Sequence, residues 1–242
     1  MDSTKITKPA RKALNLKLKY CGAVIVAAGS ASRMEGTDKI MADLCGESVI
    51  CRTVKAFEDC DAIKEIVIVT REDLLMAVTD ACSCFSKVTA VVVGGKDRAE
   101  SVNNGLNALS KKVKVAAIHD GARPLIDWQT IDRVVRAGST YGAAAPAVPV
   151  KDTVKIVTGG IVKETPDRSA LQAVQTPQVF DFDLIRGALA KAQADKITLT
   201  DDCSAVERLG MSVKIVKGEE RNLKITTPMD LKIARMLWED AQ

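Results

Sequence analysis

Short apolar runs of high β-propensity alternate along this chain with segments whose apolar residues recur at helical spacing. The runs predict strands at residues 23–27, 65–70, 88–93, 115–118 and 143–148. The segments between them predict helices at residues 49–59, 73–81, 99–110 and 127–137. This alternation predicts an α/β fold with a largely parallel sheet and helices on both faces. Ligands of such sheets bind beyond the carboxyl ends of the strands, so we expect the site in the loops after the first, third and fourth strands.

The pattern changes after residue 150. Two short β-prone runs, residues 154–157 and 161–164, are joined by Thr158-Gly159-Gly160, which is typical of a hairpin turn. An isolated two-stranded ribbon is marginal in water, so this hairpin must pack on its own body or on another chain. Further elements are predicted at residues 181–194 and 202–209 (helices), 213–216 (strand) and 228–238 (helix).

Composition excludes several protein classes. The chain has 242 residues, of which 47% are hydrophobic and 27% charged, values that argue against a disordered, collagen-like or coiled-coil protein. Its longest uncharged stretches, residues 20–32 and 137–150, are shorter than the roughly 20 apolar residues of a membrane helix. We therefore expect no membrane span.

The net charge of +4 is unevenly distributed, because residues 1–19 carry +5 and the remainder carries −1. A nearly neutral body argues against nucleic-acid binding, which needs basic residues clustered on the fold itself. We predict a basic, flexible tail at residues 1–19 and a single domain at residues 20–242. The tail resembles neither a secretory signal nor a transit peptide, so the expected location is the cytoplasm.

Cysteine and histidine usage restricts the chemistry. The seven cysteines are scattered, which predicts reduced thiols, and the close pair Cys82 and Cys84 lacks further ligands at zinc-finger spacing. His119 is the single histidine. Catalysis by Ser/His/Asp and metal sites with several histidines are therefore difficult to build.

The first predicted strand leads into the small-residue segment AAGSASRM at residues 27–34, with Lys39 beyond it. Small side chains let the backbone approach a triphosphate, and exposed amides in such a turn can bind its oxygens. Arg33 and Lys39 add two cations. The segment matches neither the P-loop nor the G-x-G-x-x-G pattern, and a tight strand-to-helix turn with solvated cations remains the alternative on these residues alone.

Several other motifs follow in a characteristic order: GGKDRAES (94–101), HDGARP (119–124), PVKDT (149–153), QTPQ (175–178), TDD (200–202) and NLKITTPMDL (222–231). Together with the first loop, they resemble the 2-C-methyl-D-erythritol 4-phosphate cytidylyltransferases of the non-mevalonate isoprenoid pathway. The resemblance covers residues 21–238. It implies a Rossmann-like three-layer nucleotidyltransferase fold with a mostly parallel sheet and a protruding β-hairpin arm at about residues 150–174.

The resemblance also implies the reaction. A phosphate monoester, methylerythritol phosphate, attacks the α-phosphorus of CTP and expels pyrophosphate. Because this nucleophile is already anionic at neutral pH, no general base is needed, and catalysis depends on cations that stabilise the transition state. Mg²⁺ is the implied cofactor, and the implied assembly is a homodimer in which each arm reaches into the partner's site.

The resemblance assigns roles to individual residues of this chain. The catalytic cations are Arg33, Lys39 and Lys224, and the Mg²⁺ ligand, which is also grouped with the nucleotide site, is Asp120. The remaining nucleotide-binding residues are Ala27, Ala28, Gly29, Gly95 and Ser101. The acceptor phosphate is assigned to Thr153, Arg168, Thr176 and Thr200, of which the first two lie on the arm. His119 is interpreted as a residue that positions its loop and not as a catalytic base.

Two departures from the family pattern lie in the first loop. Ala31 stands where a second glycine is usual, and Asp38, Lys39 and Ile40 stand where proline, lysine and glutamine are usual. A carboxylate at position 38 is unfavourable beside a triphosphate if it points inward, so its orientation bears on the geometry of Lys39.

Three other functions are alternatives. A ribitol 5-phosphate cytidylyltransferase would share the nucleotide loops but differ in its acceptor arm. A sugar 1-phosphate nucleotidyltransferase would carry a fuller glycine run. A catalytically inactive nucleotide-binding scaffold would have little use for Arg33, Lys39, Asp120 and Lys224 together.

Overall fold

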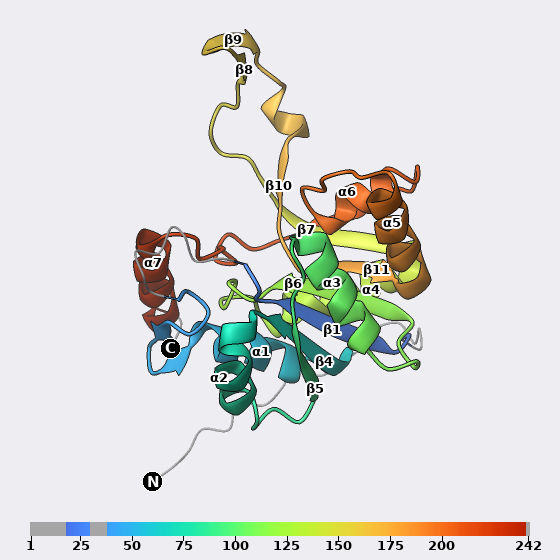
Figure 1. The fold of residues 1–242 in the computed structure, drawn as a ribbon. Helices are drawn as coiled ribbons and strands as arrows, with labels where there is room; N and C mark the ends of the chain where they lie inside the picture. The colour runs from blue at the N-terminus through green and yellow to red at the C-terminus, as the bar shows by residue number, and fades with distance from the viewer. Residues whose placement is uncertain (1–17, 30–37, 241–242) are drawn as a thin grey trace, which may run out of the picture.

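A single eight-stranded sheet forms the centre of the molecule in the computed structural model, which describes residues 18–29 and 38–240 (Figure 1). Seven of the strands follow the order β10-β7-β11-β6-β1-β4-β5, and β12 pairs with β7. Their bounds are β1 (Cys21–Val26), β4 (Ile63–Thr70), β5 (Val88–Val93), β6 (Val115–Asp120), β7 (Ala143–Pro149), β10 (Gln172–Val174), β11 (Gln178–Asp181) and β12 (Lys214–Lys217).

Parallel pairing dominates the sheet, as the sequence predicted. Strand β1 pairs in parallel with β4 and β6, β4 pairs in parallel with β5, and β12 pairs in parallel with β7. Strands β10 and β11 were not predicted, and both run antiparallel to their neighbours. Their sequences, QAV and QVFD, lack the runs of β-branched residues that mark the predicted strands.

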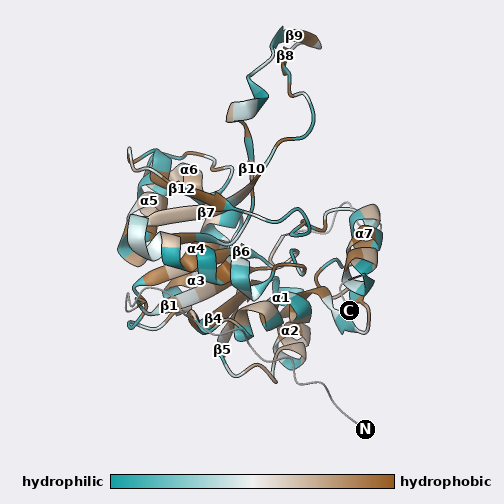
Figure 2. Ribbon diagram, turned by 180° about the vertical axis from the view of Figure 1, so that it is seen from behind, coloured by the Kyte–Doolittle hydropathy of each residue, from teal (hydrophilic) through white to brown (hydrophobic). Residues whose placement is uncertain are grey.

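Helices cover both faces of the sheet and give the predicted three layers. One core cluster joins it to α1 (Val49–Glu58), α2 (Leu75–Ala81), α4 (Trp128–Tyr141) and α7 (Pro228–Glu239). The other joins it to α3 (Arg98–Ala108), α5 (Phe182–Ala194) and α6 (Asp202–Glu207). Consecutive residues of β1, Ala23 and Val24, belong to opposite clusters because side chains alternate across a strand. Figure 2 accordingly shows apolar colour along the central strands.

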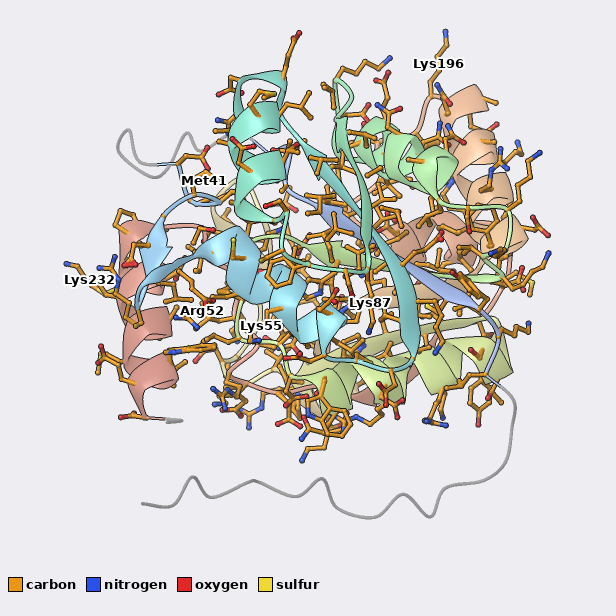
Figure 3. The ribbon with its side chains drawn as sticks, turned by 90° about the horizontal axis from the view of Figure 1, so that it is seen from below. Met41, Arg52, Lys55, Lys87, Lys196 and Lys232 are labelled. Atoms are coloured by element: carbon orange, nitrogen blue, oxygen red, sulfur yellow. The ribbon has the colours of Figure 1, made fainter. Side chains whose placement is uncertain are left out.

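The C-terminal helix α7 is held against α1 by a buried cation. The Arg52 guanidinium lies 3.8 Å from the centre of the Trp238 ring, and Arg52 Nε donates to the Leu44 carbonyl at 2.7 Å. Figure 3 shows Arg52 between the two helices, whereas Lys55 and Lys232 point outward. This contact ties the C-terminal end of α7 to α1.

Local chemistry sets the element ends. Helix α4 runs to Tyr141, beyond the predicted end at residue 137, because Gly142 supplies the left-handed C-cap (φ +83°). A small hairpin that was not predicted, β2 (Asp43–Leu44) and β3 (Glu47–Ser48), turns through Cys45 and Gly46 at positive φ. The Ser48 hydroxyl then caps α1 by accepting from Cys51 N–H.

The predicted hairpin is present and extends away from the body (Figure 1). It comprises β8 (Ile156–Thr158) and β9 (Ile161–Glu164), joined by Gly159 and Gly160, both at positive φ. A short 3₁₀ helix, η2 (Arg168–Ala170), lies between it and β10; another, η1 (Glu72–Leu74), precedes α2. All residues of β8 and β9 are exposed, so this hairpin packs on no described part of its own body, whereas β10 pairs with β7 in the central sheet.

Among the described residues, no helix is both long enough and apolar enough to cross a membrane. All seven cysteines lie in the described part of the chain, and all are free thiols. The predicted tail, residues 1–19, lies outside the described residues apart from its last two positions.

Candidate active site

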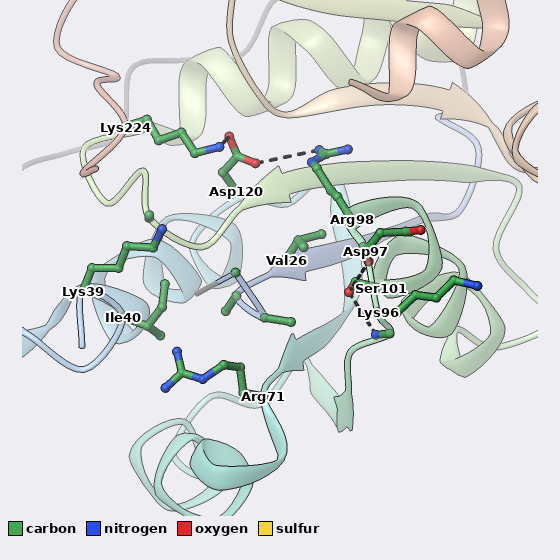
Figure 4. A pocket seen from close by; sticks show the side chains of 15 residues that line it. Val26, Lys39, Ile40, Arg71, Lys96, Asp97, Arg98, Ser101, Asp120 and Lys224 are labelled. Atoms are coloured by element: carbon green, nitrogen blue, oxygen red, sulfur yellow. Dashed lines mark hydrogen bonds and ion pairs between the residues drawn. The ribbon is translucent and has the colours of Figure 1, made fainter. Parts of the chain in front are cut away.

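A cavity of about 360 Å³ opens at the carboxyl ends of β1, β5 and β6, where the sequence predicted it (Figure 4). Five cationic side chains and two carboxylates are among its described lining residues: Lys39, Arg71, Lys96, Arg98 and Lys224, with Asp97 and Asp120. The volume is in the range of small-molecule sites. Its excess of positive charge suits an anionic ligand.

The loop after β1 forms one wall of the cavity with the predicted Ala27, Ala28 and Gly29. Ala27 N–H donates to the Val69 carbonyl at 2.7 Å, which anchors the loop to the neighbouring strand β4. The small side chains leave the backbone of this wall accessible to a ligand. The predicted Arg33 lies outside the described residues.

The loop after β5 forms the opposite wall and leads into α3. Ser101 Oγ accepts from Gly95 N–H at 3.0 Å and donates to the Asp97 carbonyl at 2.8 Å. A Cβ atom at Gly94 would collide with the side chain of Ala28, so the two walls approach as closely as they do because position 94 is glycine. The N-terminus of α3 lines this cavity, where the Asp97 carboxylate caps it by accepting from Glu100 N–H at 2.8 Å.

Asp120 at the end of β6 is the electrostatic centre of the site. Its Oδ2 lies 3.1 Å from Lys224 Nζ and 3.2 Å from Arg123 Nε, and its Oδ1 lies 3.8 Å from Arg98 Nη2. Figure 4 shows Lys224 and Arg98 approaching it from opposite sides. Burial alone raises the pKa of Asp120, but the three cations outweigh burial and hold it well below its usual value. The carboxylate is therefore ionised at neutral pH.

His119 supports Asp120 from beneath the cavity. It is fully buried, and burial lowers the pKa of its imidazole to about 3, so the ring is neutral. Its Nδ1 lies 3.0 Å from Thr176 Oγ1, which accepts from Asp120 N–H at 3.1 Å, and its Nε2 lies 3.3 Å from the Arg123 carbonyl. These contacts agree with a neutral tautomer that donates from Nε2 to Arg123 and accepts from Thr176. The positioning role predicted for His119 fits this arrangement.

The segment that carries Lys224 is tied to the Asp120 loop. Ile225 N–H donates to the Ala122 carbonyl at 2.8 Å, and Arg123 Nη1 donates to the Asn222 carbonyl at 2.7 Å. Asn222 is fully buried, and its Nδ2 donates to the Thr176 carbonyl at 2.9 Å. Residues about a hundred positions apart are thereby brought to one side of the cavity.

Arg98 links the cavity to the start of α6. Its Nη1 lies 2.7 Å from Asp202 Oδ1, and Asp202 is almost fully buried. Gln178 Oε1 accepts from the N–H groups of Asp202 and Cys203 at 3.0 Å each. The TDD and QTPQ motifs therefore meet through Gln178 and orient Arg98 toward Asp120.

The structure brings most of the predicted site residues together, with exceptions among those assigned to the acceptor. The cavity is lined by Ala27, Ala28, Gly29, Lys39, Gly95, Ser101, Asp120 and Lys224. Thr176 contacts the cavity residue Asp120, whose N–H donates to the Thr176 hydroxyl. Thr200 is exposed just before α6. Thr153 and Arg168 are exposed on the arm and do not line this cavity, and Arg168 Nη1 donates to the Lys151 carbonyl at 2.8 Å.

Sequence reasoning did not assign roles to Arg71, Arg98 and Arg123. Two of these arginines lie within the motifs that the sequence singled out, GGKDRAES and HDGARP. Arg71 directly follows a predicted strand, at the same sheet edge as the other loops. Its position after β4 is the available signal, because parallel strands end at the same edge of the sheet.

Comparison with known proteins agrees with this geometry. The model of the 2-C-methyl-D-erythritol 4-phosphate cytidylyltransferase family (IspD) matches residues 21–240. The chain belongs to this family. A family enzyme from Dehalococcoides mccartyi is 45% identical over 219 residues, covering 89% of this chain and 95% of that protein. One from Caldanaerobacter subterraneus is 41% identical over 223 residues, covering 88% and 96%.

Solved structures of other enzymes of this cytidylyltransferase family have the same fold as this chain. A crystal structure of 4-diphosphocytidyl-2C-methyl-D-erythritol synthase from Anaerococcus prevotii superposes with a TM-score of 0.83 at 31% identity, covering 91% of this chain and 96% of that one. The enzyme from Thermus thermophilus gives a TM-score of 0.75 at 31% identity, covering 91% and 99%. The resemblance and the three-layer fold expected from the sequence are thus confirmed.

The residues of this cytidylyltransferase family member fit a magnesium ion only together with the phosphate groups of a bound substrate. No group of three or more metal-binding side chains occurs among the described residues. Asp120 nevertheless offers an ionised, hard oxygen donor at the cavity wall, and Mg²⁺ in proteins commonly takes one or two carboxylates together with substrate phosphates. Asp120 is therefore the residue that would hold the ion.

Proposed function

We propose that this enzyme transfers CMP from CTP to 2-C-methyl-D-erythritol 4-phosphate, giving 4-diphosphocytidyl-2-C-methyl-D-erythritol and pyrophosphate, in isoprenoid precursor synthesis. The observation that carries the proposal is the family match over residues 21–240. The cationic cavity at the predicted sheet edge supports it independently, since its lining suits a triphosphate.

In the proposed reaction, a phosphate oxygen of the acceptor forms a bond to the α-phosphorus of CTP. The bond from that phosphorus to the oxygen bridging to the β-phosphate breaks, and pyrophosphate leaves with the electron pair. No proton has to be removed from the ionised acceptor. The neutral, fully buried His119 agrees with a reaction that needs no general base.

The chain's main contribution is fixed positive charge. Lys39 and Lys224 reach into the cavity from different segments and would neutralise the charge that develops on the phosphates, together with Arg33. The backbone walls and Ser101 would hold the cytosine and the ribose. Asp120 would hold Mg²⁺, which when bound adds further positive charge beside the triphosphate.

The proposed active unit is a homodimer. Thr176 and Thr200 belong to the body of one chain, whereas Thr153 and Arg168 lie on the exposed arm. The arm tip carries apolar side chains that are exposed in one chain, among them Ile156, Ile161 and Val162. Exchange of arms between two-fold related chains would bury this tip and bring Arg168 to the partner's acceptor site.

We also propose that the enzyme works in the cytoplasm and binds no nucleic acid. The free thiols of all seven cysteines suit a reducing compartment. The body outside residues 1–19 carries a net charge of −1, which gives no electrostatic footprint for a polyanion.

A pyrophosphate-release assay tests the function. Each of the common nucleoside triphosphates is combined with methylerythritol phosphate, ribitol 5-phosphate or a sugar 1-phosphate in the presence of Mg²⁺. We expect CTP with methylerythritol phosphate to give the highest kcat/KM. A preference for ribitol 5-phosphate or the sugar phosphate would reassign the acceptor, and no release from any combination would indicate a scaffold without catalysis.

A further inference from the structure

The carboxylate of Asp38 stands next to Lys39, where it could oppose a bound triphosphate. The structure places it elsewhere. Asp38 Oδ2 lies 2.7 Å from Arg71 Nη1, and Asp38 Oδ1 accepts from the N–H groups of Ile40 at 2.8 Å and Met41 at 3.3 Å. Oδ1 is therefore engaged with the backbone of the following turn and Oδ2 with the Arg71 guanidinium, and Asp38 is not among the residues that line the cavity.

Arg71 comes from a different part of the fold. It follows the last residue of β4, so the ion pair joins the carboxyl end of this strand to the segment around Lys39. The Arg71 side chain is 27% exposed and the Asp38 side chain is 19% exposed. Because both are largely buried, solvent screens their attraction only weakly. Figure 4 shows the Arg71 guanidinium turned toward the segment that carries Lys39 and Ile40.

Lys39 is fixed on both sides by these contacts. Asp38 is held by Arg71, and Ile40 is 1% exposed with its carbonyl accepting from Ile50 N–H at 3.0 Å. The Lys39 side chain extends into the cavity, and a Cβ atom built on Gly29 would lie 4.0 Å from Lys39 Nζ. The ammonium group thus lies over the backbone of the first loop.

We propose that Asp38 and Arg71 form a charged clasp that positions Lys39 for catalysis and neutralises the carboxylate that replaces the usual proline. The inference rests on the proposed function, because it assigns a purpose to the position of Lys39 in CMP transfer. Asp38 acts through Lys39 and is a positioning residue, and Arg71 holds Asp38 while also lining the cavity. The clasp explains how this chain tolerates an acidic side chain beside its triphosphate site.

Arg71 has a second acidic partner that provides a matched control. Asp73 Oδ1 and Oδ2 accept from Arg71 Nε at 3.0 Å and Nη2 at 2.9 Å, but the Asp73 side chain is 65% exposed and does not line the cavity. Asp38 still holds Arg71 when the Asp73 charge is removed, and the exposed Asp73 pair is screened by solvent. Removal of the Asp73 charge should therefore leave Lys39 in place.

A double-mutant cycle with Asp38→Asn, Arg71→Gln and the double variant tests the clasp. Asparagine can still accept from Ile40 N–H, so Asp38→Asn removes mainly the ion pair. We expect its kcat to fall on the order of 10-fold with KM for CTP nearly unchanged, because a displaced transition-state cation acts on kcat. Arg71→Gln should also raise KM for CTP, since it leaves the Asp38 carboxylate without a cation.

The double variant decides between coupling and independence. We expect its kcat/KM to be no lower than that of Arg71→Gln, because no unpaired carboxylate remains. Asp73→Asn should stay within about twofold of the wild type. Additive losses in the double variant, or a normal kcat for Asp38→Asn, would overturn the clasp.

A measurement without turnover separates the clasp from the proposed function. Limited acetylation of the unliganded protein, followed by mass spectrometry, gives the reactivity of Lys39 relative to the exposed Lys112. We expect Asp38→Asn and Arg71→Gln to change this ratio several-fold and Asp73→Asn to leave it unchanged. Equal ratios in all variants would contradict the clasp even in an active enzyme. A changed ratio in a protein without transferase activity would retain the clasp and refute the proposed function.

Discussion

The cavity and the arm carry the two halves of the predicted site, and the chain organises them in opposite ways. Around the cavity, Asp120 is 7% exposed and three cations surround it. On the arm, no residue between 151 and 174 is buried, and Thr153 and Arg168 lie in solvent. One chain is therefore sufficient to arrange the residues around the cavity, whereas under the proposed function Thr153 and Arg168 on the arm need the surface of a second chain.

The difference has an energetic origin. Ordering a charged side chain costs conformational entropy, and near the cavity this cost is offset by burial, hydrogen bonds and opposite charges. The arm has few such compensating contacts within its own chain. Its hairpin is defined by backbone pairing and a glycine turn, and an isolated ribbon of this size is marginal in water.

Substitution of Asp120 by asparagine should produce the largest effect and tests the cavity side of the comparison. It keeps the shape of the side chain but leaves Arg98, Arg123 and Lys224 without their shared carboxylate. We expect kcat to fall by at least about 100-fold, the scale of losing a central electrostatic group. The melting temperature should also fall, because three cations then repel one another. Steady-state kinetics and thermal unfolding measure both effects.

The control for Asp120→Asn is Asp80→Asn, which neutralises an exposed carboxylate on α2. We expect it to behave like the wild type. Normal turnover of Asp120→Asn at limiting Mg²⁺ would contradict the metal-binding role of Asp120.

Complementation between two inactive variants tests the arm side. Lys39→Ala damages the cavity, and Arg168→Ala damages the arm. Unfolded and refolded together, the two chains should form hybrid dimers in which one site is doubly damaged and the other intact. We expect about a quarter of the wild-type activity, because random assembly makes half of the dimers hybrid and each has one intact site of two.

Two controls define the outcome of the mixing experiment. Each variant refolded alone should remain inactive, and native mass spectrometry should verify the hybrid dimer. If verified hybrids show no recovery, Arg168 serves its own chain or has no role, and the division of the site between two chains is wrong.

The smallest expected effect is a change in the pH dependence of stability, and it comes from the buried His119 beneath the cavity. Burial holds the pKa of His119 at about 3 against an ordinary value of 6.5. As the pH falls below 6.5, His119 takes up a proton in the unfolded chain but not in the folded one, so stability is lost. By pH 5 the loss from this residue should be about 2 kcal/mol.

His119→Gln removes the titration while keeping a donor and an acceptor. Chemical denaturation at pH 7.5 and pH 5 should therefore show a smaller acid destabilisation in the variant than in the wild type. An equal acid destabilisation in both proteins would mean that other groups account for the pH dependence. Exposed groups of the arm should contribute little to it.

Much of the fold follows from local sequence patterns. Alternating apolar runs place β1, β4, β5, β6 and β7 and the helices between them, because burial on a sheet and helical periodicity are local properties. The Gly159-Gly160 turn likewise marks the arm hairpin. The short strands β10 and β11 could not be predicted in this way, since their pairing with β7 and β6 depends on tertiary contacts.

Local patterns in the sequence predicted the layered α/β architecture and the loops that line the cavity, and the order of its motifs predicted the family. Three features instead depend on tertiary contacts: Arg71 pairs with Asp38, Gln178 holds the backbone of Asp202 beside Arg98, and the β8–β9 hairpin packs on no described part of its own body. The physical reason is the distance along the chain between the residues that determine each property. Backbone periodicity is set by neighbours along the chain, whereas the ionisation and orientation of a buried charge depend on groups that only folding brings within a few ångströms.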